Sequence, residues 1–144
     1  MPSLVTERIE SVKAGVVGAS VFAIAELVIA LLDKMAVITI IESTQNSIFL
    51  SWELPLQLAI GALSGFLFGV TYRYIIRDDR NSHLNDGAVL AFGLVRGLAL
   101  IEKNLVLSEL LSAVFLILQS IICFAIVRFV LDLAIDRKLI KPFV

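Results

Sequence analysis

Two opposite charges stand inside long apolar runs of this chain, and their types and positions are the ones most suited to chemistry. Glu26 interrupts the run of residues 14–32, and Arg96 interrupts the stretch GAVLAFGLVRGLALI at residues 87–101. If these runs cross a bilayer, each charge costs about 2.5–3.5 kcal/mol on insertion scales and should have a partner. Glu26 lies twelve residues into its run and Arg96 nine into its own. At 1.5 Å per residue both lie about 14–18 Å deep, so the sequence predicts an intramembrane Glu26–Arg96 ion pair.

Two roles are open for this ion pair. As a structural clasp, the two charges neutralise each other and fix which helices are neighbours. As a functional site, Glu26 is a carboxylate that binds a proton or a substrate along a membrane pathway. Because an adjacent arginine keeps a carboxylate ionised and makes it a poor proton carrier, the structural role is favoured.

No residue pattern typical of an enzyme accompanies these charges. The sequence has no HExxH motif, no serine–histidine pair in an apolar run and no pair of aspartates at mid-depth. The single cysteine, Cys123, lies in an apolar run and is expected to contribute only to packing. The single histidine, His83, lies in a hydrophilic stretch and is expected to be solvated. We therefore predict no enzyme activity and no catalytic, metal-binding or cofactor-binding residues.

The runs that hold the charges are typical of a membrane protein. The 144 residues are 59% hydrophobic, whereas soluble domains are about 45–50% apolar. A bilayer core requires about 20 apolar residues per helix, which predicts one all-α domain over residues 1–144, a bundle of four transmembrane helices. The expected spans are residues 14–32, 54–72, 87–103 and 110–131.

Glycines recur at four-residue spacing in two of these spans. Gly61, Gly65 and Gly69 lie in the second span, and Gly93 and Gly97 lie in the third. Small residues at this spacing allow another helix to approach closely. The second span therefore has a close-packing face, used within the chain or between subunits. Internal packing is favoured because four helices joined by short loops must pack on one another.

The distribution of lysine and arginine predicts the orientation. Nine of these residues fall in the N-terminal segment, in residues 73–86 and at the C-terminal end, against two on the opposite side. The positive-inside rule then places both termini in the cytoplasm. Residues 35–53 either extend the first helix as far as a turn near residues 45–47, which is slightly favoured, or form an interfacial segment that folds back over the bundle.

Polar and aromatic residues mark the ends of the expected spans. Tyr-Arg-Tyr at residues 72–74 predicts interface anchors, and residues 77–86 predict the most hydrophilic loop. Arg128 and Asp132 stand four residues apart, which predicts an ion pair along the end of the fourth helix.

Two non-enzymatic function classes fit these features best. The first is an accessory subunit or an assembly or scaffold protein of a larger membrane complex, favoured by the glycine faces and the absence of a catalytic set. The second is a small oligomeric transporter that uses Glu26. The stretch AIAELVIALLDK at residues 23–34 resembles the first helix of small multidrug resistance transporters, which implies a glutamate that binds cation and proton. This chain differs in its embedded Arg96 and in its strong orientation bias.

A second resemblance concerns the middle of the chain. The run GVTYRYIIRDDRNSHLNDGAVLAFGLVRGLA at residues 69–99 resembles small integral membrane proteins of cyanobacteria and plastids, a group without a settled biochemical role. This resemblance implies a plasma membrane or thylakoid setting and favours the accessory role, including one in a photosynthetic complex. The expected partners are the lipid bilayer and other membrane subunits or a second copy. A net charge of −1 predicts no affinity for nucleic acid.

Overall fold

The computed structural model describes residues 3–40, 53–76, 81–101 and 110–142, and its regular structure there is entirely helical. The all-α class is therefore confirmed, with four helices. The expected turn near residues 45–47 lies outside the described residues. The helices are α1 (Leu4–Ile40), α2 (Glu53–Ile75), α3 (Ser82–Ala99) and α4 (Leu110–Asp136).

Three of the four described helices, α1, α2 and α4, are long and apolar enough to cross a membrane. Helix α3 is not apolar enough, although four spans were expected. Its 18 residues begin with the polar segment SHLND and include Arg96, and both features lower its hydropathy. The last part of the expected third span, residues 102–103, lies outside the described residues.

Local capping explains why two helices begin earlier than the expected spans. The Ser3 hydroxyl accepts a hydrogen bond from the backbone N–H of Thr6 at 3.3 Å, which satisfies an N–H at the start of α1. At α3 the side chain of Asn81 accepts from the backbone N–H of His83 at 3.2 Å. As a result residues 82–86, expected to lie in a loop, form the first turn of α3, where His83 is exposed.

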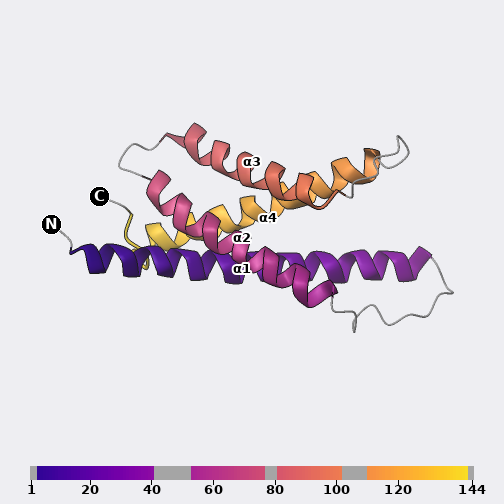
Figure 1. Cartoon of the computed structure of the whole chain (residues 1–144), viewed down its shortest axis with the longest axis horizontal. Coiled ribbons are helices and arrows are strands. Elements are labelled where there is room, and N and C mark those ends of the chain that lie inside the picture. Colours follow the sequence, from indigo (N-terminus) through magenta and orange to yellow (C-terminus); the bar gives the residue numbers. More distant parts are fainter. Residues whose placement is uncertain (1–2, 41–52, 77–80, 102–109, 143–144) are drawn as a thin grey trace.

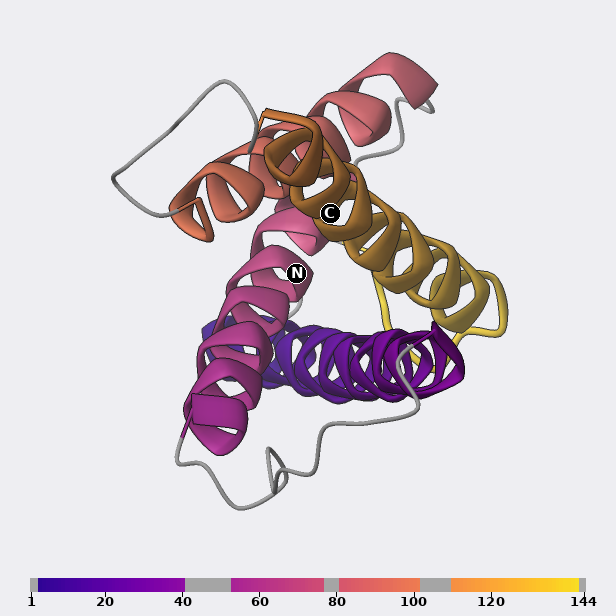
Figure 2. The same ribbon diagram turned by 90° about the vertical axis from the view of Figure 1, so that its right-hand side faces the viewer.

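The helices run up and down as two hairpins, α1–α2 and α3–α4 (Figure 1). Helix α1 begins and α4 ends at the end of the bundle where α2 ends and α3 begins, and this end is called the terminal end below. Packing is most extensive within each hairpin, and the hairpins meet through contacts of α4 with α1 and α2 and of α2 with α3. Helices α1 and α3 lie on opposite sides of the bundle (Figure 2), and the described residues show no direct packing between their backbones.

An aromatic cluster fills the centre of the bundle with one ring from each helix. The ring of Phe124 on α4 lies 4.7 Å from that of Phe22 on α1, 5.2 Å from Phe68 on α2 and 5.7 Å from Phe92 on α3, between centroids. Such ring pairs contribute about 0.5–1.5 kcal/mol each beyond the area they bury. The cluster therefore holds both hairpins together at the centre of the bundle.

Glycines bring the helices of each hairpin into backbone contact. In the first hairpin a Cβ atom added at Gly65 would lie 2.5 Å from the carbonyl oxygen of Gly18, and one added at Gly69 would overlap the carbonyl oxygen of Ala14. In the second hairpin a Cβ at Gly93 would lie 2.6 Å from Cγ1 of Ile121 on α4. These glycines face a helix of the same chain.

A candidate site formed by a buried ion pair and a polar cavity

The structure brings Glu26 and Arg96 together between the two hairpins. Arg96 Nη2 donates a hydrogen bond to Glu26 Oε1 at 2.5 Å. The Arg96 and Glu26 side chains are 8% and 13% exposed. Because the backbones of α1 and α3 do not pack directly, the two long side chains bridge the space between them. The guanidinium carbon of Arg96 also lies 5.2 Å from the ring centroid of Phe22, close enough for a cation–π contact.

Gly61 on α2 makes room for the Glu26 carboxylate. A Cβ atom at this glycine would overlap Glu26 Oε2 and would lie 3.0 Å from Glu26 Cδ. The contacts of Gly69 with Ala14 and of Gly65 with Gly18 step along α1 by four residues, and Gly61 continues this register toward Glu26. Sequence reasoning placed Gly61 only in a packing stripe, but the antiparallel register gives it a second role as support for the carboxylate.

The other expected packing glycines, Gly93 and Gly97, face the backbone of α4 and not the ion pair itself. A Cβ at Gly97 would lie 2.7 Å from Cα of Ile117 on α4. Arg96 is the neighbour of Gly97 on α3, so the close approach of α3 and α4 fixes the helix that carries the arginine. The ion pair is thus positioned by a glycine contact from each hairpin.

A cavity of about 170 Å³ lies next to the ion pair, on the side away from the terminal end. It can hold several water molecules, each of which occupies roughly 30 Å³ in the liquid. All four helices contribute to its walls. The polar residues that line it are Glu26 and Asp33 of α1, Gln57 of α2, Arg96 of α3, and Gln119 and Ser120 of α4. Cys123, a buried free thiol, also lines it.

Two polar atoms in the cavity wall have no hydrogen-bond partner among the described residues. They are Glu26 Oε2 and Ser120 Oγ, and both are buried. An unsatisfied buried polar group costs about 1–3 kcal/mol, and more when it is charged. Water, or another molecule with hydrogen-bond donors, could satisfy these two atoms from the cavity. Of the formal charges in the wall, Glu26 and Asp33 outweigh Arg96, so the lining is negative overall.

Arg73 is a buried ion-pair residue and not the interface anchor that the sequence suggested. Its side chain is fully buried, and its Nη2 lies 2.5 Å from Glu7 Oε2. It also donates from Nη1 to Ser11 Oγ at 2.7 Å and from Nε to the carbonyl oxygen of Lys141 at 2.8 Å. The sequence feature that could have predicted this site is the pair Glu7 and Ser11, an acid and a hydroxyl one turn apart on a helix that begins at Leu4.

A second group of polar contacts ties the other helices together at the terminal end. Tyr72 donates from its hydroxyl to Asp132 Oδ1 at 2.6 Å. The ion pair expected along α4 is present, with Arg128 Nε 3.6 Å from Asp132 Oδ2. Arg128 also pairs with Asp86 of α3. Ion pairs and hydrogen bonds therefore connect all four helices at the terminal end. The other half of the bundle, where the cavity lies, contains the polar atoms without hydrogen-bond partners.

No family model, no curated protein and no solved structure matches this chain. In the described parts of the chain no group of three His, Cys, Asp or Glu residues is arranged to hold a metal ion. The fold defines an all-α bundle with three helices suited to cross a membrane. What this protein does has to be inferred from Glu26, Arg96 and the cavity beside them.

Proposed function

We propose that the chain is an integral membrane protein that crosses the plasma or thylakoid membrane four times, with both termini in the cytoplasm or its stromal equivalent. Helix α3 is the fourth crossing because it runs antiparallel to α4 and because its embedded charge, Arg96, is neutralised by Glu26. Basic residues concentrate at the terminal end, which supports the orientation.

The topology can be tested with single cysteines in a Cys123→Ala background. Arg137→Cys reports on the terminal end and Lys103→Cys on the link between α3 and α4. A membrane-impermeant maleimide added to intact cells should label only Lys103→Cys. Labelling of Arg137→Cys under the same conditions would contradict the orientation.

Within this topology, transport of a small monovalent cation fits the geometry better than a purely accessory role. The observation that carries this proposal is the buried Glu26 Oε2, which has no partner among the described residues and belongs to a side chain that lines a polar cavity. A cation with N–H donors can satisfy this oxygen and Ser120 Oγ together. It also balances the excess negative charge of the cavity wall.

The ion pair offers a way to couple binding to movement. Contacts within each hairpin are more extensive than those between hairpins, and the Glu26–Arg96 pair links one hairpin to the other. A cation that takes up part of the Glu26 charge weakens this link and so favours a different hairpin arrangement. The aromatic cluster separates the cavity from the terminal end, so such a rearrangement is required for passage.

Uptake of radiolabelled methylammonium into proteoliposomes tests the proposal. An inside-negative potential should drive uptake by the wild-type protein, and Glu26→Gln should abolish it. Asp136→Asn, which removes an exposed acid outside the cavity, is the matched control and should leave uptake unchanged. A well-folded wild-type protein that takes up no methylammonium would exclude this substrate class.

The accessory or assembly role is the second candidate, and the outer face of α3 favours it. Leu90, Leu94 and Leu98 form an exposed apolar stripe on this helix. The helix has 18 residues, which at 1.5 Å per residue span about 27 Å, short of a bilayer core of about 30 Å. A neighbouring membrane subunit or a second copy would cover this short helix. Gentle solubilisation and affinity purification should then return a larger complex, and a lone monomer would argue against this role.

A further inference from the structure

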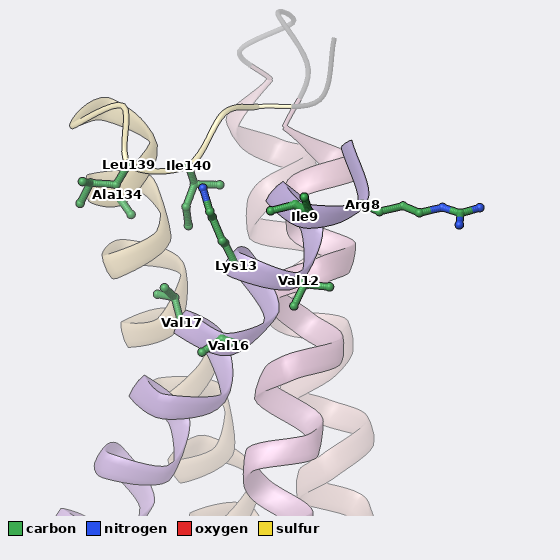
Figure 3. Close-up of a pocket in the computed structure, with 9 residues that line it drawn as sticks. All are labelled: Arg8, Ile9, Val12, Lys13, Val16, Val17, Ala134, Leu139 and Ile140. Atoms are coloured by element: carbon green, nitrogen blue, oxygen red, sulfur yellow. The ribbon is translucent and has the colours of Figure 1, made fainter. Parts of the chain in front are cut away.

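A second hollow lies at the terminal end, on the lipid-facing side of α1. It is a groove of about 540 Å³ between the first half of α1 and the turn that follows α4 (Figure 3). Its walls are almost entirely apolar. They are formed by Ile9, Val12, Val16 and Val17 of α1 and by Ala134, Leu139 and Ile140, with the stems of Arg8 and Lys13 at the edge.

One wall of the groove is built by an unusual helix end. Lys138 has φ +57°, and it is the one described residue other than glycine with a positive φ. Its N–H bonds the carbonyl oxygen of Ile135 at 2.9 Å, and the N–H of Leu139 bonds that of Ala134 at 2.9 Å. This is a Schellman motif, in which the left-handed position is normally filled by glycine. Here a lysine occupies it, directly before the groove residue Leu139.

Two basic residues, Arg8 and Lys13, lie at the edge of the groove. Lys13 extends along the groove beside Ile140, and Arg8 points outward from its edge (Figure 3). Lys13 donates to Glu10 Oε1 at 2.8 Å, but its side chain is 52% exposed and it has further donors. Lys138 is also exposed.

The nearby acids cancel only part of this charge. Glu10 is bonded to Lys13 and to the backbone N–H of Lys141, and Glu7 is bonded to Arg73. Asp136 is the remaining acid at the end of α4, against Arg8 at the groove edge and Arg137 and Lys138, which directly precede the groove residue Leu139 in the chain. The rim is therefore positive while the walls are apolar.

We propose that this groove binds an anionic phospholipid from the leaflet at the terminal end. An acyl chain lies against the apolar walls, and Lys13 and Lys138 hold the phosphate. The groove opens toward the bilayer because Val12 and Val16 are each 53% exposed. Lysine side chains suit this ligand, because their apolar stems lie along the acyl region while their charges stay at headgroup depth. The site is separate from the Glu26 cavity and does not depend on transport.

Native mass spectrometry with equal amounts of phosphatidylglycerol and phosphatidylcholine of identical acyl chains tests the proposal. The wild-type protein should retain phosphatidylglycerol at least tenfold better. Replacing Lys13→Gln and Lys138→Asn together should remove most of this preference, because each lysine near an anionic headgroup contributes about fivefold. Asparagine is chosen because it tolerates a positive φ. Lys34→Gln, at the opposite end of α1, should leave the preference unchanged.

Filling the groove provides an independent check. Val16→Trp places a large ring on a groove wall and should reduce retention of both lipids, whereas Val95→Trp on the exposed face of α3 should not. Equal retention of the two lipids by the wild-type protein would overturn the proposal. So would a thermal shift with inorganic phosphate as large as that with phosphatidylglycerol, since this indicates a simple anion site. A photoreactive amino acid placed at position 16 should capture lipid in native membranes. Capture of another protein at this position, and not of lipid, would also overturn the proposal.

Discussion

Gly61 lies directly behind the Glu26 carboxylate, on the helix that packs against α1. A Cβ atom at this position would overlap Glu26 Oε2 and lie 3.1 Å from Cε1 of Phe22. The carboxylate therefore reaches Arg96 only because α2 has no side chain at this point. One glycine links the packing of the first hairpin to the geometry of the ion pair.

We expect Gly61→Ala to destabilise the protein by about 2–4 kcal/mol, because the displaced carboxylate leaves Arg96 buried without its partner. Gly87→Ala is the matched control. Nothing lies within 4 Å of an added Cβ there, so this change should be neutral or should stabilise α3 by up to about 1 kcal/mol. Thermal unfolding in detergent measures both. Equal effects of the two substitutions would show that Gly61 does not support Glu26.

The ion pair itself is tested by a double-mutant cycle. We expect Glu26→Gln or Arg96→Leu alone to cost about 3–5 kcal/mol, because each leaves a buried charge without its partner. The double variant should recover part of this loss. The measurement is the free energy of unfolding of all four proteins under the same detergent conditions. Strictly additive losses would mean that the two side chains are not energetically coupled.

Hydrophobic runs and charge positions predicted the features of this protein that depend on single elements. The all-α class follows from the long apolar runs. The depth count predicted that Glu26 and Arg96 are neighbours, and in the structure Glu26 Oε1 lies 2.5 Å from Arg96 Nη2. Depth can be counted because rise per residue is constant in a helix. Rotation about the helix axis cannot be counted in this way, and it decides what Gly61 faces.

Features that depend on how the helices dock were not predicted. Arg73 was expected at the membrane interface because it stands between two tyrosines at the end of the second span. Since α1 begins at Leu4, Glu7 and Ser11 become helical and can meet Arg73. The polar cavity was also missed, because it combines side chains from all four helices and no single segment carries its pattern.

Arg73 should be among the residues most sensitive to substitution. We expect Arg73→Met to cost about 3–5 kcal/mol, because it leaves Glu7 without its partner in a buried site. Arg73→Lys should restore only part of the loss, since one ammonium group cannot reproduce contacts made in three directions by Nε, Nη1 and Nη2. Arg137→Gln, at an exposed position, is the control. Thermal unfolding compares the three, and full stability of Arg73→Lys would show that charge alone matters.

Ser120 distinguishes a cavity that binds a ligand from one that is only a packing defect. Its hydroxyl is buried without a partner among the described residues, so Ser120→Ala should leave the ligand-free protein as stable as before or more stable by about 1 kcal/mol. If a cation bridges Glu26 and Ser120, the same change should raise the methylammonium concentration needed for half-maximal uptake by about tenfold or more, because a hydrogen bond to a charged group contributes roughly 1.5–3 kcal/mol. Ser112→Ala, at an exposed position on α4, should change neither quantity. A stabilised variant with unaltered uptake would place the transported ion away from Ser120.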